Sequence, residues 1–278
     1  MRNFRRILII LVVTAGVFLL GGTFWLRDRY VVPIITYHHV GKLADESLIL
    51  NTVSVESFEK QMHFLKKYGY HVISFKDLVD GLKKGRLFQR DTVVIQFDDG
   101  YEDNYTNAFP ILKEYEFPAM VFLVSDFIGT HKGFLNWAQV KEMEKYHFMA
   151  GAHTRLHKYL PNLSEDEIRE EVFGSKRVIE DHLSHPIEYF AYPSGGFNVP
   201  VKQIVKEAGF EAAVTTNRGK DRFNKDLYEL KRIRMNDGDN RFGGVILWAK
   251  LSGYYNLLRK SKDGGSVVLP VKSTYVEQ

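Results

Sequence analysis

The sequence contains no cysteine. Disulfide bonds and thiolate metal sites are therefore both excluded, and any metal must be held by histidine, aspartate or glutamate. There is also little excess charge, because the net charge is +4 over 278 residues. A surplus so small and evenly spread gives no reason to expect a nucleic-acid partner. No internal repeat or low-complexity linker interrupts the chain, so its length favours one large domain with a substantial core.

One long apolar run stands near the start of the chain. Arg2, Arg5 and Arg6 precede it, and Ile7–Leu26 carries no charge. About 20 helical residues span roughly 30 Å, the thickness of the hydrocarbon core of a bilayer. We expect residues 1–30 to form an uncleaved membrane anchor whose N-terminus is cytoplasmic, with the rest of the chain extracytoplasmic. A cleaved signal peptide is the alternative, although no clear A-x-A-like site follows the run.

Beyond the anchor, strand-like apolar runs alternate with amphipathic helix patterns. Strands are expected at residues 31–37, 71–75, 118–124, 148–152, 189–191, 212–215 and 228–233, with one more opening at Thr92. Helices are expected at residues 54–68, 77–84, 105–115, 136–146, 164–182 and 198–208. This alternation implies right-handed βαβ units and a parallel sheet or barrel over residues 31–242. Residues 243–278 have no clear role, although residues 245–258 could form a helix.

The stretch TVVIQFDDG, Thr92–Gly100, ends an apolar run with two adjacent carboxylates, Asp98 and Asp99. Adjacent carboxylates at the end of a buried strand repel each other, so a cation or a shared proton should accompany them. In α/β folds, the carboxyl ends of strands are where ligands bind. Taken alone, DDG is also typical of a simple strand-ending turn.

A second polar pair, His153 and His157, follows the strand expected at 148–152. On a helical turn, this spacing would put both imidazoles on one face, within reach of one cation. Two histidines and one aspartate make a triad that leaves coordination positions open for water and substrate. Only one aspartate of Asp98 and Asp99 is needed as a ligand. The other would then lie where a general base can take the proton of an attacking water.

Five motifs, in this order, resemble the polysaccharide deacetylases with a NodB-homology domain. They are YHHV at Tyr37–Val40, FDDGY at Phe97–Tyr101, NAFPILK at Asn107–Lys113, HTRLH at His153–His157 and FAYPSGG at Phe190–Gly196. The resemblance covers about residues 34–236. It implies a distorted (β/α)7 barrel, here preceded by one transmembrane helix. The implied reaction removes the N-acetyl group from an acetamido sugar in a polymer and releases acetate.

The resemblance also implies roles for individual residues. Asp98 is then the general base, while Asp99, His153 and His157 hold one divalent metal ion. Zn²⁺ is the expected metal, and Co²⁺, Ni²⁺ or Fe²⁺ also suit two histidines and one aspartate. The backbone N–H of Ser194 is expected to face the developing oxyanion.

The general acid cannot be assigned by matching this chain to many of its relatives, because in them the histidine of a late L-x-H motif supplies the acid. No histidine follows His185 in this chain. His38, at the end of the first strand, matches the circularly permuted branch that acts on poly-β-1,6-N-acetylglucosamine. We expect His38 to be the acid, because a histidine is protonated near neutral pH with modest help. His39 is the alternative, and packing without chemistry is another interpretation of His38.

The residue that orients the base also departs from the family pattern. Many relatives have an arginine where this chain has Ala191. Arg232 or Arg234, near the end of the last expected strand, could supply that charge from another direction. A solvated charge run is the competing interpretation of both arginines.

The sequence therefore predicts a membrane-anchored, extracytoplasmic, metal-dependent deacetylase of a polysaccharide that contains N-acetylglucosamine. A peptidoglycan N-deacetylase or a polysaccharide O-acetyl esterase would use the same scaffold. An alternative of another class is a catalytically silent carbohydrate-binding protein. Such a protein would be expected to lack the base or a metal ligand, and all four residues are present.

Overall fold

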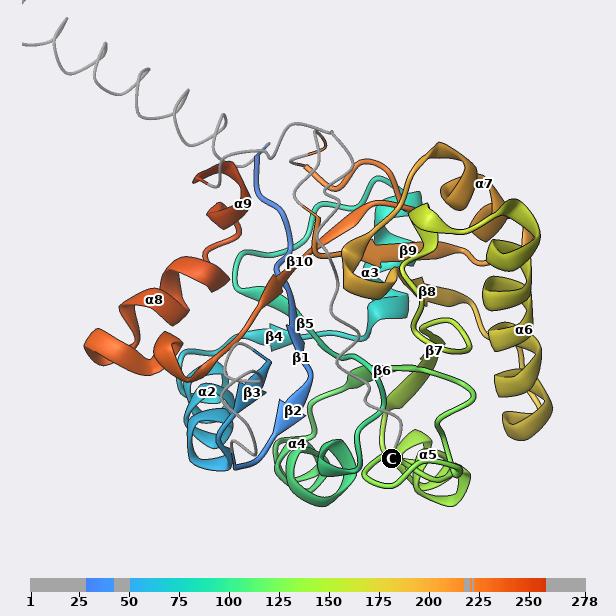
Figure 1. The fold of residues 1–278 in the computed structure, drawn as a ribbon. Coiled ribbons are helices and arrows are strands. Elements are labelled where there is room, and N and C mark those ends of the chain that lie inside the picture. Colours follow the sequence, from blue (N-terminus) through green and yellow to red (C-terminus); the bar gives the residue numbers. More distant parts are fainter. Residues whose placement is uncertain (1–28, 43–50, 218–220, 222, 259–278) are drawn as a thin grey trace, which may run out of the picture. The chain divides into compact units, whose positions relative to one another are not determined.

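Seven parallel strands close into a barrel in the computed structural model, which describes residues 29–42, 51–217, 221 and 223–258 (Figure 1). β1 (Ile34–Tyr37) pairs with β10 (Leu230–Arg234) on one side and with β5 (Thr92–Phe97) on the other, which closes the ring. The ring continues through β6 (Ala119–Leu123), β7 (Phe148–Ala152), β8 (Tyr189–Ala191) and β9 (Ala212–Thr215). The predicted (β/α)7 barrel is therefore confirmed.

Three short strands lie outside this ring. β4 (His71–Val72) pairs with the beginning of β5. β2 (His39–Val40) and β3 (Thr52–Val53) form a separate two-stranded parallel sheet that the sequence analysis did not foresee. Two residues are too few to show a period in the sequence, so β2 and β3 left no signal, whereas β4 lies within the run predicted as a strand at residues 71–75.

Helices pack around the barrel strands; most of them connect successive strands of the chain, and α8 and α9 follow the last strand, β10 (Figure 1). They are α2 (Val55–Lys67), α3 (Phe75–Lys83), α4 (Phe109–Tyr115), α5 (Trp137–Glu144), α6 (Glu165–Leu183), α7 (Val199–Glu207), α8 (Arg241–Leu251) and α9 (Tyr255–Leu258). Four short helical turns complete the elements, η2 (Asn104–Ala108), η3 (Leu160–Asn162), η4 (Pro193–Gly195) and η5 (Asp237–Asn240). Side-chain N-caps begin five of these helices, at Ser54, Ser74, Asn136, Ser164 and Asn198. The helix expected at 245–258 is divided into α8 and α9.

The barrel strands owe their apolar sequences to burial on both faces. Every residue of β5 and β6 is buried. Within the barrel strands the buried polar side chains include Thr36, Gln96 and Arg232. Polar groups in such an interior need partners, and Arg232 Nη1 contacts the Thr36 hydroxyl, whereas the Gln96 amide has no hydrogen-bond partner among the described residues.

The predicted membrane span, residues 7–26, lies outside the described residues. In the part of the chain that the structure describes, no helix has the length and apolar character to cross a bilayer.

Candidate active site

The predicted site residues follow the carboxyl ends of several barrel strands. His38 comes directly after β1, Asp98 and Asp99 follow β5, and His153 follows β7. Parallel strands all point the same way, so these ends meet at one face of the barrel. Residues far apart in sequence are thereby brought into one cluster.

Asp98 is bound by Arg232 from inside the barrel. The two guanidinium nitrogens Nη1 and Nη2 donate to Asp98 Oδ1 at 2.5 Å and to Oδ2 at 2.7 Å. The side chains are only 1% and 3% exposed, and Arg232 Nη1 lies 3.3 Å from the Thr36 hydroxyl. A bidentate pair of this kind fixes the plane of the carboxylate as well as its charge. Of the two arginines considered, Arg232 therefore reaches the base position, and it is no solvated surface charge.

Asp99, His153 and His157 form the group that suits a metal ion. Asp99 Oδ1 lies 3.5 Å from His153 Nε2 and 3.4 Å from His157 Nε2. Ligand atoms held about 2.1 Å from a cation at tetrahedral angles lie about 3.4 Å apart, so the spacing fits. Asp99 Oδ1 is buried and accepts no hydrogen bond from the described residues. Buried polar atoms normally have a partner, and a cation would be a suitable partner for this carboxylate oxygen.

The tautomer of His153 is set by the backbone of β8. Its Nδ1 lies 2.7 Å from the carbonyl oxygen of Ala191, which can only accept, so Nδ1 carries the proton. Nε2, which faces Asp99, then presents a lone pair for a cation. Ala191 thus contributes to the site through its backbone carbonyl.

The segment from His153 to His157 is not a helical turn, and that part of the sequence prediction is wrong. Thr154 and His157 have positive φ angles of 65° and 57°. The two imidazoles converge because the backbone folds back in a loop, in which the N–H of His157 donates to the Thr154 hydroxyl at 3.0 Å. Loop geometry therefore replaces helix periodicity as the reason that both rings face Asp99.

Glu171 of α6, which the sequence analysis overlooked, holds this loop in place. Its Oε2 accepts hydrogen bonds from the backbone N–H groups of Arg155 and Leu156, each at 2.9 Å. Glu171 is 3% exposed, and a buried carboxylate must be matched by donors. The sequence did contain a signal. Glu171 lies three residues after Ile168 and next to Val172, so the helical period places it on the buried, apolar face of α6.

The electrostatics keep both aspartates ionised. Burial alone would raise the pKa of Asp98, but Arg232, His153 and His38 outweigh it and hold that pKa well below its usual range. Burial is likewise outweighed at Asp99, whose pKa His157, His38 and His153 lower. Burial lowers the pKa of His153 to about 4, so this imidazole is neutral at pH 7 and able to bind a cation.

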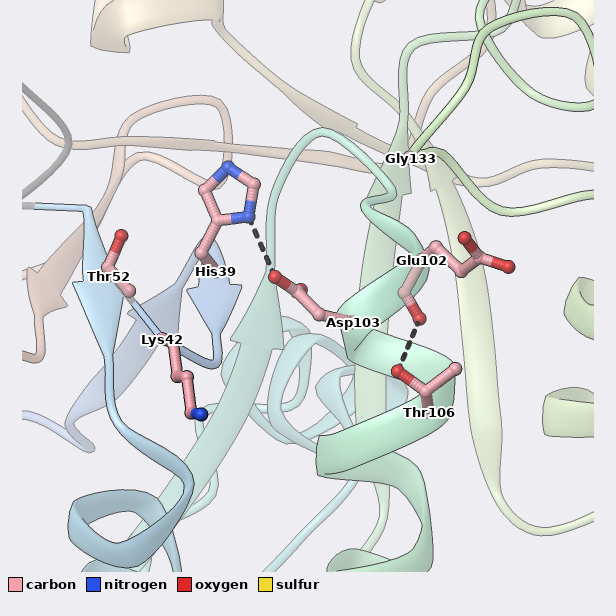
Figure 2. A pocket seen from close by; sticks show the side chains of 7 residues that line it. All are labelled: His39, Lys42, Thr52, Glu102, Asp103, Thr106 and Gly133. Atoms are coloured by element: carbon pink, nitrogen blue, oxygen red, sulfur yellow. Dashed lines mark hydrogen bonds and ion pairs between the residues drawn. The ribbon is translucent and has the colours of Figure 1, made fainter. Parts of the chain in front are cut away.

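The two neighbouring histidines His38 and His39 have different surroundings. His38 Nε2 lies 3.8 Å from Asp98 Oδ2. Its Nδ1 is buried with no partner among the described residues. Burial lowers the pKa of His38, and the nearby aspartates offset only part of this effect, so the expectation that its surroundings help to protonate it is wrong for the metal-free site. His39 instead bonds Asp103 Oδ2 at 2.8 Å (Figure 2) and stacks on the ring of Tyr101. Only His38 is thus beside Asp98.

Ser194 lies in the turn η4, which follows β8. Its φ of 52° places it in the left-handed region. The internal hydrogen bonds of the turn begin with the N–H of Gly195, which donates to Tyr192, so the Ser194 N–H precedes them. Arg234 ends β10 and is partly buried. Burial lowers its pKa, and its backbone carbonyl accepts a hydrogen bond from Lys250.

Comparisons with known proteins agree with this arrangement. The family model described as polysaccharide deacetylase matches residues 86–213. YxkH of Bacillus subtilis, named as a polysaccharide deacetylase, is 30% identical over 217 residues, which cover 77% of this chain and 76% of YxkH. A poly-β-1,6-N-acetyl-D-glucosamine N-deacetylase of Staphylococcus aureus is 28% identical over 200 residues, 67% of this chain and 68% of that protein.

Solved structures share the fold. The Streptococcus pyogenes deacetylase PplD, in complex with acetate, superposes with a TM-score of 0.71 at 28% identity, over 79% of this chain and 97% of PplD. IcaB from Ammonifex degensii superposes with a TM-score of 0.69 at 24% identity, over 80% and 97% of the two chains. With its barrel, its site and these relatives, the chain belongs to the polysaccharide deacetylase family.

Proposed function

We propose that this enzyme removes N-acetyl groups from N-acetylglucosamine residues of an extracytoplasmic polysaccharide and releases acetate. One observation carries the proposal: a three-residue metal group, Asp99, His153 and His157, lies beside a separate carboxylate, Asp98, that faces His38. This set contains a cation site, a base and an acid, which amide hydrolysis requires together. The Staphylococcus aureus relative, by its name, acts on poly-β-1,6-N-acetyl-D-glucosamine, which supports a polymer of this sugar as the substrate.

The first step is attack of a water on the acetamide carbonyl carbon. A divalent cation held by Asp99, His153 and His157 supplies, when bound, a lowered pKa for a coordinated water and polarisation of the carbonyl. Asp98 takes the proton of the attacking water. Both of its oxygens accept from Arg232, and each oxygen keeps a second lone pair for this proton. The Ser194 N–H donates to the carbonyl oxygen as negative charge develops there.

The second step breaks the carbon–nitrogen bond, and the amine must leave with a proton. His38, whose Nε2 lies 3.8 Å from Asp98 Oδ2, gives that proton to the nitrogen. Acetate and a free amino sugar are the products. An ester would expel an oxygen leaving group that needs less help. The buried histidine beside Asp98 thus favours N-deacetylation over O-acetyl ester hydrolysis.

The location of the enzyme is also part of the proposal. The uncharged run Ile7–Leu26 behind three arginines supports a membrane anchor with the catalytic domain outside the cytoplasm. A polysaccharide outside the cell would then be within reach of the enzyme. Fractionation of the full chain with membranes, resistant to alkaline carbonate, is the expected result, and a mature N-terminus between Gly21 and Arg29 would contradict it.

The proposed activity is tested by acetate release from poly-β-1,6-N-acetylglucosamine, chitin oligomers and peptidoglycan, measured side by side. The first polymer should give the highest rate. Asp99→Asn should lose the metal, because a neutral amide is a poor cation ligand. Asp98→Asn should keep the metal and lose roughly 10²–10⁴-fold in rate, as expected for a removed general base. Metal loss in Asp98→Asn but not in Asp99→Asn would reverse the two roles.

A further inference from the structure

A short segment after β6, Val124–Asp126, joins the two parts of the chain that supply the metal group. Its first N–H donates to the carbonyl oxygen of Asp99 at 3.4 Å. Its second and third N–H groups donate to the carbonyl oxygens of Thr154 and Arg155, at 3.1 and 3.2 Å. This bridging segment is therefore bonded to the aspartate of the metal group and also to the loop between the two histidines.

An ion pair between Asp126 and Arg155 reinforces this junction. Arg155 Nε lies 3.2 and 3.0 Å from the two carboxylate oxygens, and Nη2 lies 2.7 Å from Oδ2. The Ser125 hydroxyl lies 2.9 Å from Asp126 Oδ1 and can donate to it. The other terminal nitrogen of the guanidinium, Nη1, bonds Glu170 of α6. A planar guanidinium held by two carboxylates in this way fixes the direction of the side chain that carries it.

Gly174 of α6 leaves the space in which the Arg155 side chain lies. A Cβ atom at this position would be 2.5 Å from Arg155 Cδ and 3.3 Å from Cγ, closer than such atoms normally approach. Glycine in the middle of a helix is less stable than alanine, so a glycine there needs a packing reason. The Arg155 side chain supplies that reason, because it packs against α6 at this glycine.

The loop that these contacts hold has a backbone that local preference does not favour. Thr154 and His157 have positive φ angles, a region that costs free energy for residues other than glycine. Such a backbone persists only where its surroundings determine it. Glu171 supplies two hydrogen bonds to this loop from α6. The bridging segment and the Asp126–Arg155 pair supply further contacts from the chain that follows β6.

We propose that Asp126, Arg155 and Gly174 position the metal group. The ion pair, seated on Gly174, keeps the two histidines turned towards Asp99 before a metal ion binds. These residues act through the backbone of the loop and are not ligands themselves. A site that is arranged in advance loses less conformational freedom on binding, so its affinity is higher. This role rests on the proposed function, because that function requires the metal group.

The affinity of full-length, metal-free protein for Zn²⁺, measured by chelator competition, tests this role. Arg155→Met removes the ion pair and should weaken Zn²⁺ binding about 10–100-fold, the usual effect of losing a group that orients metal ligands. Arg155→Lys keeps the charge without the planar fork, so it should recover part of the loss.

The matched control is Arg169→Met. Arg169 of α6 also pairs with two carboxylates, those of Glu165 and Glu207, at 2.9 and 2.7 Å. Its side chain is 39% exposed, and that of Arg155 is 33% exposed. Loss of a comparable ion pair away from the loop should leave Zn²⁺ affinity at the wild-type value.

Gly174→Ala tests the same role without removing either charge. The added methyl group displaces the Arg155 side chain, whereas alanine favours the helix. Zn²⁺ binding should therefore weaken although α6 itself is not destabilised. The double variant Asp126→Asn/Arg155→Met should lose about as much affinity as the larger of its two single losses, because the two residues act as one pair.

Amide hydrogen exchange in metal-free protein reports whether the loop is arranged beforehand. The N–H groups of Ser125 and Asp126, which are bonded to the loop, should exchange slowly in wild type and about tenfold faster in Arg155→Met. Protection that appears only after Zn²⁺ is added would overturn the inference. So would a Zn²⁺ affinity in Arg155→Met and Gly174→Ala equal to that of the Arg169→Met control. Wild-type protein that binds Zn²⁺ but releases no acetate from any polymer would reject the proposed function, and the Zn²⁺ comparison would still decide the role of the pair.

Discussion

Replacing Arg232 with methionine would leave the carboxylate of Asp98 alone inside the barrel. Asp98 is 3% exposed, and Arg232 supplies two hydrogen bonds of 2.5 and 2.7 Å to it. Removing one partner of a buried ion pair typically costs about 3–5 kcal/mol, because the remaining charge is left uncompensated. For a chain of this size, that loss lowers Tm by roughly 10 °C. The measurement is thermal unfolding of metal-free wild type and Arg232→Met.

The double variant Arg232→Met/Asp98→Asn distinguishes the contribution of the ion pair from that of packing. Because it removes both charges, its loss of stability should be smaller than the sum of the two single losses, by more than about 1 kcal/mol. The folded-state pKa of Asp98 is lowered, so its stabilising contribution is present above the unfolded value near 3.9 and is lost as pH falls. The stability gap between wild type and Arg232→Met should therefore narrow in acid. Additive losses, or a gap that is constant with pH, would refute the reasoning.

Activity gives a second measurement on the same variant. Without Arg232, burial becomes the dominant influence on Asp98 and raises its pKa. The acid limb of the kcat/KM profile should then move to higher pH, because the base must be ionised to accept a proton. Arg232→Lys keeps a charge without the bidentate geometry and should lie between wild type and Arg232→Met. An acid limb that does not move would show that Arg232 does not control the base.

Three further predictions follow from the site. His38→Ala should slow acetamide hydrolysis by roughly 10²–10⁴-fold and spare aryl acetates, with metal content unchanged; equal losses on both substrates would contradict its role as the acid. In metal-free protein, the lowered pKa of His153, about 4, means that the unfolded state binds more protons between pH 4 and 6.5. Stability measured by urea unfolding should thus rise across this range, by about 3 kcal/mol for His153, and a flat profile would be the contrary result. Glu171→Ala should weaken metal binding about 10–100-fold in a chelator competition, and Glu171→Gln, which keeps one acceptor oxygen, should recover part of that loss.

Local sequence determined the elements of this protein and the types of residue at its centre. Strands buried on both faces must be continuously apolar, so β7, β8 and β9 were located within their true bounds. Helix N-caps such as Ser164 depend on residues three positions apart, so they too can be seen in the sequence. The pair Asp98 and Asp99 at the end of a buried strand also pointed to a charged site before any geometry was known.

Tertiary structure decided which residues of similar type meet. Arg232 and Arg234 are indistinguishable in the sequence, yet the register of β10 against β1 brings Arg232 to Asp98, 134 positions away. His38 and His39 are likewise adjacent, and only the first is beside Asp98.

The convergence of His153 and His157 was predicted from helix spacing, but a loop with two left-handed residues produces it. Glu171 fastens that loop from another element, through two backbone N–H groups. Such contacts join groups from different elements, whereas periodicity and capping report only on neighbours within one element. Composition and spacing therefore indicated which residue types make up the site, and the tertiary structure determined how these residues are arranged.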